Sequence, residues 1–358
     1  MLAPHRSGDK DPLGRPAAGW AKQLAEARRP GDLAAELGWP SHLVEMLRGS
    51  DFGFEARATR YYLGLVDPSD PEDPVLRQIL PSLREGQASP PGYALDAVGD
   101  RLSGHAIAPG LVHKYPGRAL LVATGACAVN CRFCFRRNYP YSEINQGGAN
   151  LHAALDAVAS DSSLSELILS GGDPLSLPDL ALSKLFNRIG EIPHITRLRI
   201  HSRMPVVLPD RISPELLRLL KTQTETLSVW FVTHFNCAAE VTPEALSACR
   251  RLANLGIPVL NQSVLLKGVN DTIGAQVALQ EGLVNSGIRP YYLHQVDRVD
   301  GVAHFEVPVD QGARLMTVLR SRITGIAMPQ WVRDVAGRPS KTPLSGDSLT
   351  TESTPSSG

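Results

Sequence analysis

The stretch Arg118–Arg137, RALLVATGACAVNCRFCFRR, joins a short apolar run to a loop that holds three of the five cysteines of the chain. Residues 118–125 are mostly apolar and end in glycine, which is the pattern of a buried β-strand. Cys127, Cys131 and Cys134 follow with the spacing C-x3-C-x2-C. Because a structural zinc site takes four ligands and a disulfide takes two cysteines, a group of three fits neither. The loop therefore indicates a group that binds three thiolates.

Downstream of this loop, strand-like and helical patterns alternate along the chain. The expected strands are 118–125, 164–172, 195–203, 226–234, 258–266 and 289–297. The expected helices lie near 150–160, 179–190, 213–222, 242–255, 272–286 and 309–323. Successive β-α units predict a parallel sheet with helices on the outside. Since a standard barrel needs eight such units and this chain offers six, we expect an α/β fold with an open or partial (β/α)6 barrel.

In folds of this kind the chemistry lies at the carboxyl ends of the parallel strands. The six predicted strand ends all carry polar residues or glycine, and they are Thr124–Gly125, Ser170–Asp173, His201–Arg203, His234, the region of Gln262, and His294–Asp297. These ends meet at one edge of the sheet, so the sequence predicts a single assembled site.

The remaining segments suggest a division of the chain. The first hundred residues are irregular, with helical patterns at 19–29 and 73–83, and Asp73–Pro74 is a typical helix start. The last dozen residues are rich in Ser, Thr, Pro and Gly, which predicts disorder. We expect a mainly helical N-terminal region at 1–107, the barrel at 108–326, a C-terminal segment at 327–345 and a disordered tail at 346–358.

Composition narrows the range of partners and compartments. The chain has 358 residues, with 36 basic and 36 acidic side chains, so no diffuse positive field attracts nucleic acid or an acidic membrane. No apolar run approaches the roughly 20 residues that span a bilayer, and the N-terminus lacks the apolar core of a signal peptide. Cys237 and Cys249 stand apart, as expected of reduced thiols. We expect a cytoplasmic protein with neither nucleic acid nor membrane as partner.

Three kinds of site compete for the cysteine loop. Zinc would need a fourth ligand such as His113 or His152, but neither has motif spacing. Buried apolar thiols are a second reading, although Arg132, Arg136 and Arg137 interleave with the cysteines. A 4Fe-4S cluster explains the number best, because three thiolates hold three irons and leave the fourth iron open to another ligand.

With Phe133 placed before its last cysteine, the loop resembles that of the radical S-adenosylmethionine (SAM) superfamily. The resemblance implies that SAM binds the open iron and that one electron, from a donor such as flavodoxin or ferredoxin, splits it to a 5′-deoxyadenosyl radical. SGGDP at 170–174 resembles the SAM-binding glycine element, since glycine allows close backbone approach. The residues that the resemblance brings to SAM are Ser170, Gly171, Gly172, Asp173, Ser202, Arg203, His234 and Gln262.

Further motifs resemble the lysine 2,3-aminomutase family over roughly residues 108 to 345. They are APGLVHKYPGRALL (108–121), RLRIHSRMPVV (197–207), NQSVLLKGVND (261–271), YYLHQVD (291–297) and PSKTPL (339–344). The resemblance implies an isomerase that converts L-α-lysine to β-lysine. It is strongest for the branch that makes (R)-β-lysine to modify elongation factor P, which implies a functional link to that factor and its lysyl ligase.

Such enzymes also hold pyridoxal phosphate (PLP) as a Schiff base on a lysine. Position alone favours Lys267, which follows the fifth predicted strand. The resemblance instead matches SKTP at Lys341 to the PLP-lysine segment. It also brings Lys114, Tyr115 and Arg118 to the phosphate and ring of PLP.

The resemblance assigns substrate contacts as well. Arg136 matches the arginine that binds the substrate carboxylate, although Arg137 beside it keeps the choice open. Asp297 and Asp334 match the acidic residues that bind the ε-ammonium, which counts against a glutamate 2,3-aminomutase.

Two departures from the family pattern limit what can be carried over. GRPS precedes Lys341 in place of the glycine run of the clostridial-type enzymes, and no cysteine follows Cys249, so neither their C-terminal zinc site nor their oligomer is carried over, while a homo-oligomer stays open. Asp334 also stands where the elongation-factor branch is expected to carry glutamate. A free-lysine enzyme of catabolism or secondary metabolism, and a non-enzymatic iron–sulfur electron carrier, stay open as alternatives.

Overall fold

The computed structural model describes residues 19–49, 51–102, 104–144 and 148–345. Its centre is one sheet in which ten strands follow each other in sequence order. The strands are β1 Ala106–Ala108, β2 Leu111–Tyr115, β3 Arg118–Thr124, β4 Glu166–Gly171, β5 Arg197–His201, β6 Ser228–Thr233, β7 Val259–Leu265, β8 Arg289–Gln295, β9 Gln330–Arg333 and β10 Thr342–Pro343. Because β1 and β10 form the two edges, the sheet does not close on itself.

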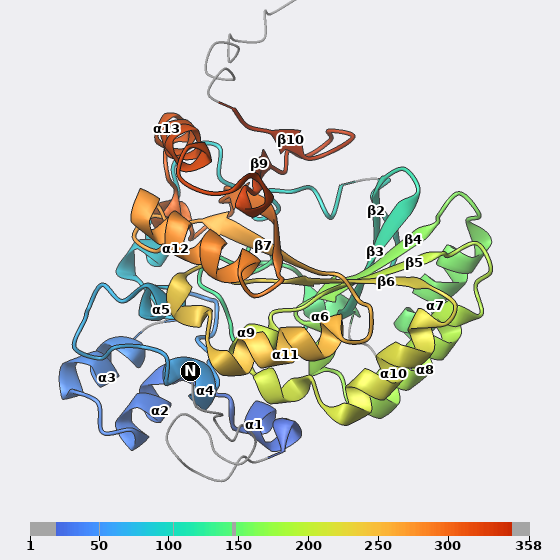
Figure 1. Cartoon of the computed structure of the whole chain (residues 1–358), viewed down its shortest axis with the longest axis horizontal. Coiled ribbons are helices and arrows are strands. Elements are labelled where there is room, and N and C mark those ends of the chain that lie inside the picture. Colours follow the sequence, from blue (N-terminus) through green and yellow to red (C-terminus); the bar gives the residue numbers. More distant parts are fainter. Residues whose placement is uncertain (1–18, 50, 103, 145–147, 346–358) are drawn as a thin grey trace, which may run out of the picture.

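Strands β3 to β9 pair in parallel, and the six predicted strands all lie among them. The helices that follow them are α6 Tyr141–Ile144, α7 Gly148–Ser160, α8 Asp179–Gly190, α9 Met204–Val207, α10 Pro214–Thr224, α11 Pro243–Ala253, α12 Ile273–Val284 and α13 Val309–Arg320. In Figure 1, α7, α8, α10 and α11 lie along one side of strands β4 to β6. The prediction of a partial (β/α)6 barrel is confirmed.

The structure adds strands that the sequence did not predict. β1 and β2 pair antiparallel with β3 at one edge, while β9 pairs parallel with β8 and then antiparallel with β10. The segment 327–345 is therefore part of the sheet. Its β9–β10 turn brings Lys341 back to the barrel.

Two outer helices begin in the same way, with a side-chain cap followed by proline. Ser213 accepts a hydrogen bond from the backbone N–H of Leu216 before α10, and Thr242 accepts one from Ala245 before α11. Proline then occupies the first helical position, where its missing N–H costs nothing. These local signals explain why the helix positions could be predicted closely.

The N-terminal helices are shorter than the sequence suggests. They are α1 Trp20–Glu26, α2 Pro30–Glu36, α3 Ser41–Leu47, α4 Arg60–Leu63 and α5 Pro74–Arg77. The predicted start at Asp73 is confirmed, since its carboxylate accepts from the N–H groups of Val75 and Leu76, but the helix ends after one turn. Short 3-10 helices complete the described elements: Leu83–Gly86, Pro174–Ser176, Pro209–Arg211, Ala238–Glu240, Ala303–Phe305 and Gly325–Ala327.

One hydrophobic cluster runs through both the N-terminal helices and the barrel. Tyr62 and Leu76 from the N-terminal region share it with Leu121 of β3 and Phe231 of β6. The boundary expected at residue 107 is therefore crossed by continuous packing. The tail at 346–358, expected to be disordered, lies outside the described residues.

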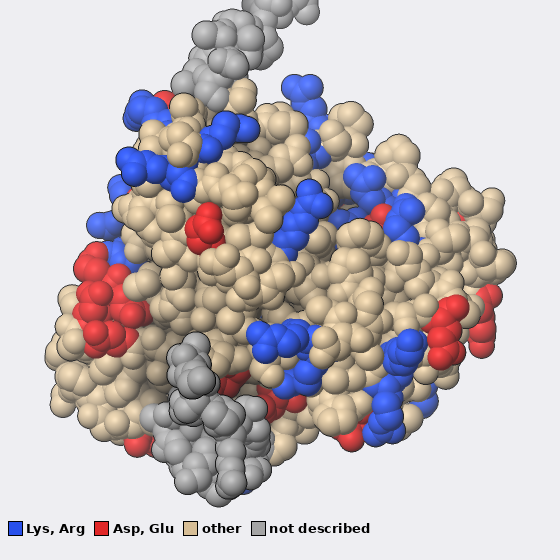
Figure 2. Space-filling model, in the orientation of Figure 1, with Lys and Arg blue, Asp and Glu red and all other residues tan. Residues whose placement is uncertain are grey.

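The surface shows no dominant sign of charge on the face that Figure 2 displays. Basic and acidic side chains lie there in small separate groups, as a net charge of zero leads one to expect. Among the described helices, none is long and apolar enough to cross a membrane.

Candidate active site

A cavity of about 760 Å³ extends along the inner side of the strands to their carboxyl ends, where the cysteine loop forms part of its wall. Every residue that the sequence assigned to the site lines it. From the loop and its flanks these are Cys127, Cys131, Cys134, Arg136, Lys114, Tyr115 and Arg118. From the other strand ends and the C-terminal segment they are Ser170, Gly171, Gly172, Asp173, Ser202, Arg203, His234, Gln262, Asp297, Asp334 and Lys341.

The three thiols are free and partly exposed toward this cavity. Burial raises the pKa of Cys127 well above its ordinary value, and burial with the neighbouring Cys131 raises that of Cys134 to about 11. Thiols in such surroundings stay protonated unless a metal takes the place of the proton. The loop therefore suits a positively charged metal group far better than free thiolates.

The alternative of a single zinc ion finds no support in the described part of the chain. There, no three His, Cys, Asp or Glu side chains converge on a point where one ion would sit. His113, considered as a fourth ligand, lies beside Asp161 instead, with 3.7 Å between its Nδ1 and the carboxylate. An iron–sulfur cube takes one thiolate per iron, so its cysteines need not converge on one point.

Two glycines let the end of β4 pack against the cysteine loop. Gly171 has a φ of +124°, and a Cβ there would lie 2.5 Å from the Thr124 carbonyl oxygen. At Gly172 a Cβ would lie 2.4 Å from the Ala126 carbonyl oxygen. The close approach that glycine permits is thus made to the backbone of the loop. A contact of either residue with SAM stays a prediction.

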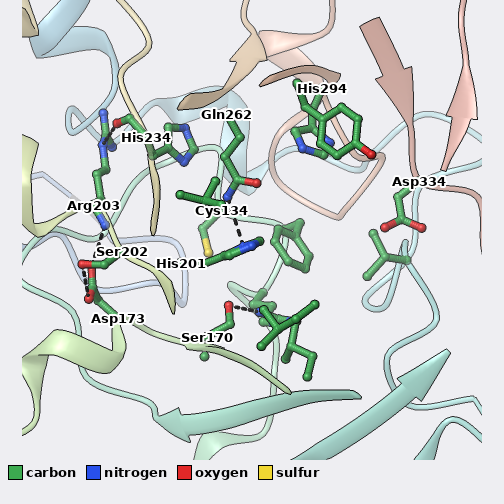
Figure 3. A pocket seen from close by; sticks show the side chains of 18 of the residues that line it. Cys134, Ser170, Asp173, His201, Ser202, Arg203, His234, Gln262, His294 and Asp334 are labelled. Atoms are coloured by element: carbon green, nitrogen blue, oxygen red, sulfur yellow. Dashed lines mark hydrogen bonds between the residues drawn. The ribbon is translucent and has the colours of Figure 1, made fainter. Parts of the chain in front are cut away.

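Asp173 ties the ends of β4 and β5 together. Its carboxylate accepts hydrogen bonds from Ser202 Oγ at 2.8 Å and from the backbone N–H groups of Arg203 and Leu175 at 2.8 and 3.0 Å. Burial raises its pKa to about 6. Asp173 and Ser202 therefore brace the site as well as lining it, as Figure 3 shows.

Imidazoles gather at the next strand ends, and the sequence predicted a role only for His234. Burial lowers the pKa of His201, His234 and His294 well below the ordinary value, so all three are neutral near pH 7. His201 Nδ1 lies 3.5 Å from Gln262 Nε2, and His201 Nε2 has no hydrogen-bond partner. A buried imidazole with a vacant nitrogen is ready to meet a polar group of a ligand.

Arg136 faces the cavity and is paired with an aspartate that the sequence did not single out. Its Nε and Nη2 lie 2.9 and 2.8 Å from Asp100 Oδ2, and its Nη1 donates to Ser170 Oγ at 3.2 Å. Three of the five N–H groups of the guanidinium are thus used, which leaves two for a ligand. Arg137 turns away to Glu85 and does not line the cavity.

Asp100 also accepts from Lys114 Nζ at 2.9 Å. Burial on its own would raise the pKa of Asp100, but Arg136 and Lys114 outweigh it and hold the pKa at about 2. No motif marks this aspartate. Only its burial beside two cations reveals it.

Lys341 lines the cavity near the two predicted acidic residues, and Lys114, which pairs with Asp100, has its Nζ 3.9 Å from Asp334 Oδ2. Its Nζ lies 2.7 Å from Asp334 Oδ2, while Tyr115 Oη donates to Asp334 Oδ1 at 3.1 Å. Lys267, the lysine that position alone favoured, is exposed and does not line the cavity. Of the described lysines, only Lys114 and Lys341 do.

Asp297 is the least satisfied acid of the site. Its Oδ1 is buried without a hydrogen-bond partner, and burial raises its pKa to about 7 although Lys341 opposes the rise. A buried carboxylate oxygen without a partner that faces a cavity suits a cationic ligand. The carboxylate oxygens of Asp297 and Asp334 thus suit an ammonium group.

Basic and aromatic side chains line the cavity toward the amino ends of β3 and β5. The guanidinium of Arg118 stacks 4.6 Å from the ring centre of Tyr115. Arg197 and Arg199, which the sequence did not assign to the site, also line it and share Glu166 as counter-ion. Arg199 Nε has no hydrogen-bond partner. Two cations for one carboxylate leave positive charge for a phosphate.

Comparison with known proteins agrees with this geometry. The family model of the radical SAM superfamily matches residues 121–274, and members of that superfamily use a 4Fe-4S cluster and SAM. An L-lysine 2,3-aminomutase of Escherichia coli (strain K12) is 43% identical over 81% of this chain and 83% of its own length. Those of Clostridium subterminale and Haemophilus influenzae are 40% and 37% identical, over 80% and 93% of this chain and 68% and 97% of theirs. The chain therefore belongs to the lysine 2,3-aminomutase family of radical SAM isomerases.

Proposed function

We propose that this protein is a PLP-dependent lysine 2,3-aminomutase that converts L-α-lysine to (R)-β-lysine. One observation carries the proposal. A single cavity joins three free cysteines, a lysine held by a carboxylate, and a buried aspartate with an unpaired oxygen. These are the groups that a radical source, PLP and a substrate ammonium require.

Each part of the cavity suits one of the cofactors. Cys127, Cys131 and Cys134 would hold the cluster, with SAM between it and the strand ends. Lys341 would hold PLP, whose phosphate would lie near Lys114, Tyr115 and Arg118. When bound, these groups would supply an electron, a hydrogen-abstracting radical and a conjugated ring that stabilises an unpaired electron while the amino group moves from Cα to Cβ of lysine.

The protein itself binds, orients and shields the substrate. Arg136, with two N–H groups to spare, would bind the carboxylate of lysine. Asp297 and Asp334 would bind the ε-ammonium. Such two-ended binding would fix the substrate in one direction within the cavity.

Asp334 links PLP binding to substrate binding. In the structure it pairs with the Lys341 ammonium at 2.7 Å. If Lys341 held PLP, its ammonium would no longer pair with Asp334, and only Lys114, whose Nζ lies 3.9 Å from the same carboxylate oxygen, would remain as a cation beside it. We therefore expect lysine to bind more tightly to the PLP-loaded protein.

Two alternatives fit the cavity less well. A glutamate 2,3-aminomutase would direct a substrate carboxylate toward Asp297 and Asp334, and like charges would repel. An iron–sulfur electron carrier would have no use for the lysines and arginines that line the same cavity as the cysteines.

The pathway that uses the product is the finer part of the proposal. The sequence resemblance favours modification of elongation factor P over free-lysine catabolism or secondary metabolism. Genes for elongation factor P or its lysyl ligase next to this one would support that link, and a low-potential flavodoxin or ferredoxin would serve as electron donor.

The assignment of the cofactors is tested by direct loading. Borohydride reduction of the PLP-treated protein should fix PLP to Lys341, as peptide mapping would show. Substitution Cys131→Ala should abolish the visible absorbance of the reconstituted cluster. A PLP adduct at Lys267, or an intact cluster in Cys131→Ala, would contradict the proposal.

A further inference from the structure

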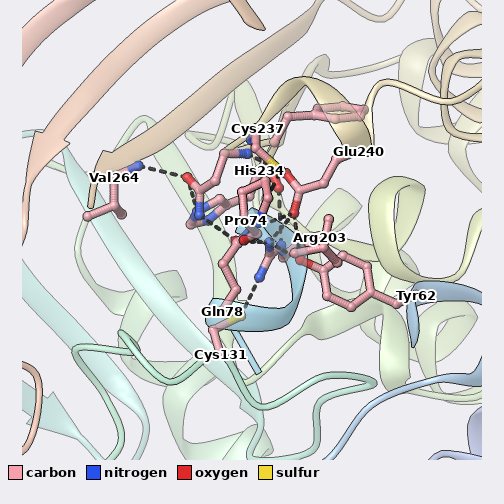
Figure 4. Close-up of polar contacts among 12 residues, drawn as sticks. Tyr62, Pro74, Gln78, Cys131, Arg203, His234, Cys237, Glu240 and Val264 are labelled. Carbon is pink, nitrogen blue, oxygen red and sulfur yellow. Dashed lines mark hydrogen bonds and ion pairs between the residues drawn. The ribbon is translucent and has the colours of Figure 1, made fainter. Parts of the chain in front are cut away.

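Arg203 lies at the centre of a buried polar network directly behind the cysteine loop (Figure 4). Its Nη1 donates a hydrogen bond to Cys131 Sγ at 2.6 Å. Only 8% of the residue is exposed. The contact is therefore a charge-assisted hydrogen bond to sulfur in surroundings that screen it weakly.

The remaining donors of Arg203 are fixed by the protein. Nε donates to the His234 carbonyl oxygen at 3.2 Å, and Nη2 donates to Gln78 Oε1 and Glu240 Oε1, both at 2.6 Å. The guanidinium also lies 5.2 Å from the ring centre of Tyr62. A guanidinium held on three sides and covered by an aromatic ring has little freedom to leave Cys131.

Glu240 is the charge partner that holds this arrangement from behind. Its Oε1 also accepts from Tyr62 Oη at 2.6 Å and from Gln78 Nε2 at 3.2 Å, while Oε2 accepts from the backbone N–H of Cys237 at 3.1 Å. The residue is completely buried. Glu240 thus forms an ion pair with Arg203, and Arg203 in turn donates a hydrogen bond to the Cys131 sulfur.

We propose that Arg203 is a positioning residue that sets the reduction potential of the cluster through its hydrogen bond to Cys131, with Glu240 limiting the positive charge that reaches the sulfur. The inference rests on the proposed role of the three cysteines as cluster ligands. Reduction adds one electron, from a low-potential one-electron donor, to the cluster. Positive charge at a ligating sulfur stabilises the added electron, so it raises the potential.

The network also gives the N-terminal region a function. Tyr62 and Gln78 belong to that region, whereas Arg203 and Glu240 belong to the barrel. Packing of the N-terminal helices therefore positions the residue that acts on the cluster. The predicted contact of Arg203 with SAM stays a separate prediction.

The test measures the cluster rather than turnover. Reconstituted proteins carrying Arg203→Gln, Arg203→Lys and Glu240→Gln are titrated anaerobically without PLP or lysine, and the reduced cluster is followed by electron paramagnetic resonance. Arg211→Lys is the control, because Arg211 is also a buried arginine paired with a carboxylate, that of Asp179, and its hydrogen bonds go to the Leu175 and Leu177 carbonyls. Iron content and the unfolding temperature of each apoprotein are measured alongside.

Arg203→Gln and Glu240→Gln should shift the reduction potential of the cluster in opposite directions. Arg203→Gln should lower the equilibrium constant for reduction at least tenfold, a shift of about 59 mV to more negative potential. Arg203→Lys should make the reduction potential more negative by a smaller amount, and Glu240→Gln should make it more positive. The Arg211→Lys control should leave the potential unchanged.

Other outcomes overturn the inference. Equal potentials in all variants, or shifts of the same sign for Arg203→Gln and Glu240→Gln, would show that the network is only structural. If Arg203→Gln and Glu240→Gln do not fold, the reduction potential of Arg203→Lys serves as the test. If Arg203→Lys loses its cluster while its unfolding temperature is unchanged, Arg203 serves only to retain the cluster, and the inference is wrong. Failure of the unsubstituted protein to bind a cluster would instead refute the proposed function.

Discussion

Asp100 is a residue of the candidate site that no sequence pattern revealed. It lies between Arg136 and Lys114 and is only 2% exposed. An aspartate in an irregular segment carries no motif, so the sequence could not single it out. Its place between two cations at the cavity wall makes it the group that orients the candidate carboxylate-binding arginine.

Substitution Asp100→Asn should weaken lysine binding more than it slows chemistry. A hydrogen bond to a charged group contributes about 1.5–3 kcal/mol, so KM for lysine should rise about 10-fold to 100-fold. Steady-state kinetics checks this, with iron and PLP contents measured to show that both cofactors are retained. Asp156→Asn is the control because Asp156 forms only an exposed ion pair with Arg188. An unchanged KM would contradict the role of Asp100.

The pKa of Asp297 predicts how activity depends on pH. Burial raises it to about 7, and Lys341 opposes that rise, so loss of the lysine charge on PLP binding will not lower it. Asp297 must be ionised to bind an ammonium. Below pH 7, kcat/KM should therefore increase about tenfold per pH unit and then level off above pH 7.

The control for this profile is Asp297→Asn, which cannot ionise. It should give a much lower kcat/KM with no inflection near pH 7. If the inflection persists in Asp297→Asn, another group is responsible for it.

At the residue scale, the sequence predicted well where spacing or strand-end position gives a signal. The cysteines and Ser170–Asp173 were found in this way, whereas Lys341 came only from the family resemblance, and all of them line the cavity. Arg199 and Asp100 were missed because their relevance depends on partners that are distant in sequence. His201 and His294 lie at predicted strand ends, yet their vacant or neutral imidazoles become evident only from burial.

At the scale of single elements, the β9–β10 hairpin decides whether Lys341 reaches the cavity. Trp331 of β9 is buried against α13, where a Cβ on Gly312 would lie 2.6 Å from its ring. The hairpin is thus positioned by a helix that passes close to a large aromatic side chain.

Gly312→Ala should therefore displace β9 and with it the PLP lysine. We expect overpacking to cost about 1–3 kcal/mol of stability and PLP occupancy to fall while iron content stays the same. Absorbance of bound PLP and iron analysis measure the two cofactors separately. Gly325→Ala is the matched control because a Cβ there meets nothing within 4 Å. Undiminished PLP occupancy in a destabilised Gly312→Ala protein would argue against this role of the hairpin.

The six main strands were predictable because each is a short run rich in apolar residues followed by a helical pattern, and three of those helices, α10, α11 and α12, begin at a side-chain cap. β9 and β10 were not, since four and two residues carry too little pattern. Position along the chain therefore favoured Lys267, whereas strand pairing at the far edge of the sheet brings Lys341 to the cavity.

At the scale of the whole molecule, the N-terminal region and the barrel share one core and jointly hold the cysteine loop. Arg132 in the loop is fully buried, with its Nη2 2.5 Å from Glu85 and its Nη1 2.6 Å from the Phe54 carbonyl oxygen. Glu85 also pairs with Arg137 at 2.7 Å. Composition alone described the first hundred residues only as irregular, because their contacts are made with distant parts of the chain.

Glu85→Gln should leave two buried arginines without their carboxylate. We expect it to lower the free energy of unfolding of the apoprotein by about 3–5 kcal/mol, as urea titration would show, and to reduce iron retention. The control is Glu36→Gln, since Glu36 makes only exposed ion pairs with Arg28 and Arg60 and its loss should change neither quantity. Normal stability and iron content in Glu85→Gln would contradict this role.

We propose that one cavity holds the cluster, SAM, PLP and lysine together for a single reaction. The most direct test is anaerobic reconstitution of the protein with iron, sulfide, PLP and SAM, followed by reduction, addition of L-lysine and chiral analysis of the products. The account predicts (R)-β-lysine, formed only when both SAM and PLP are present. Recovery of unchanged L-lysine from protein that carries both the cluster and PLP would contradict it.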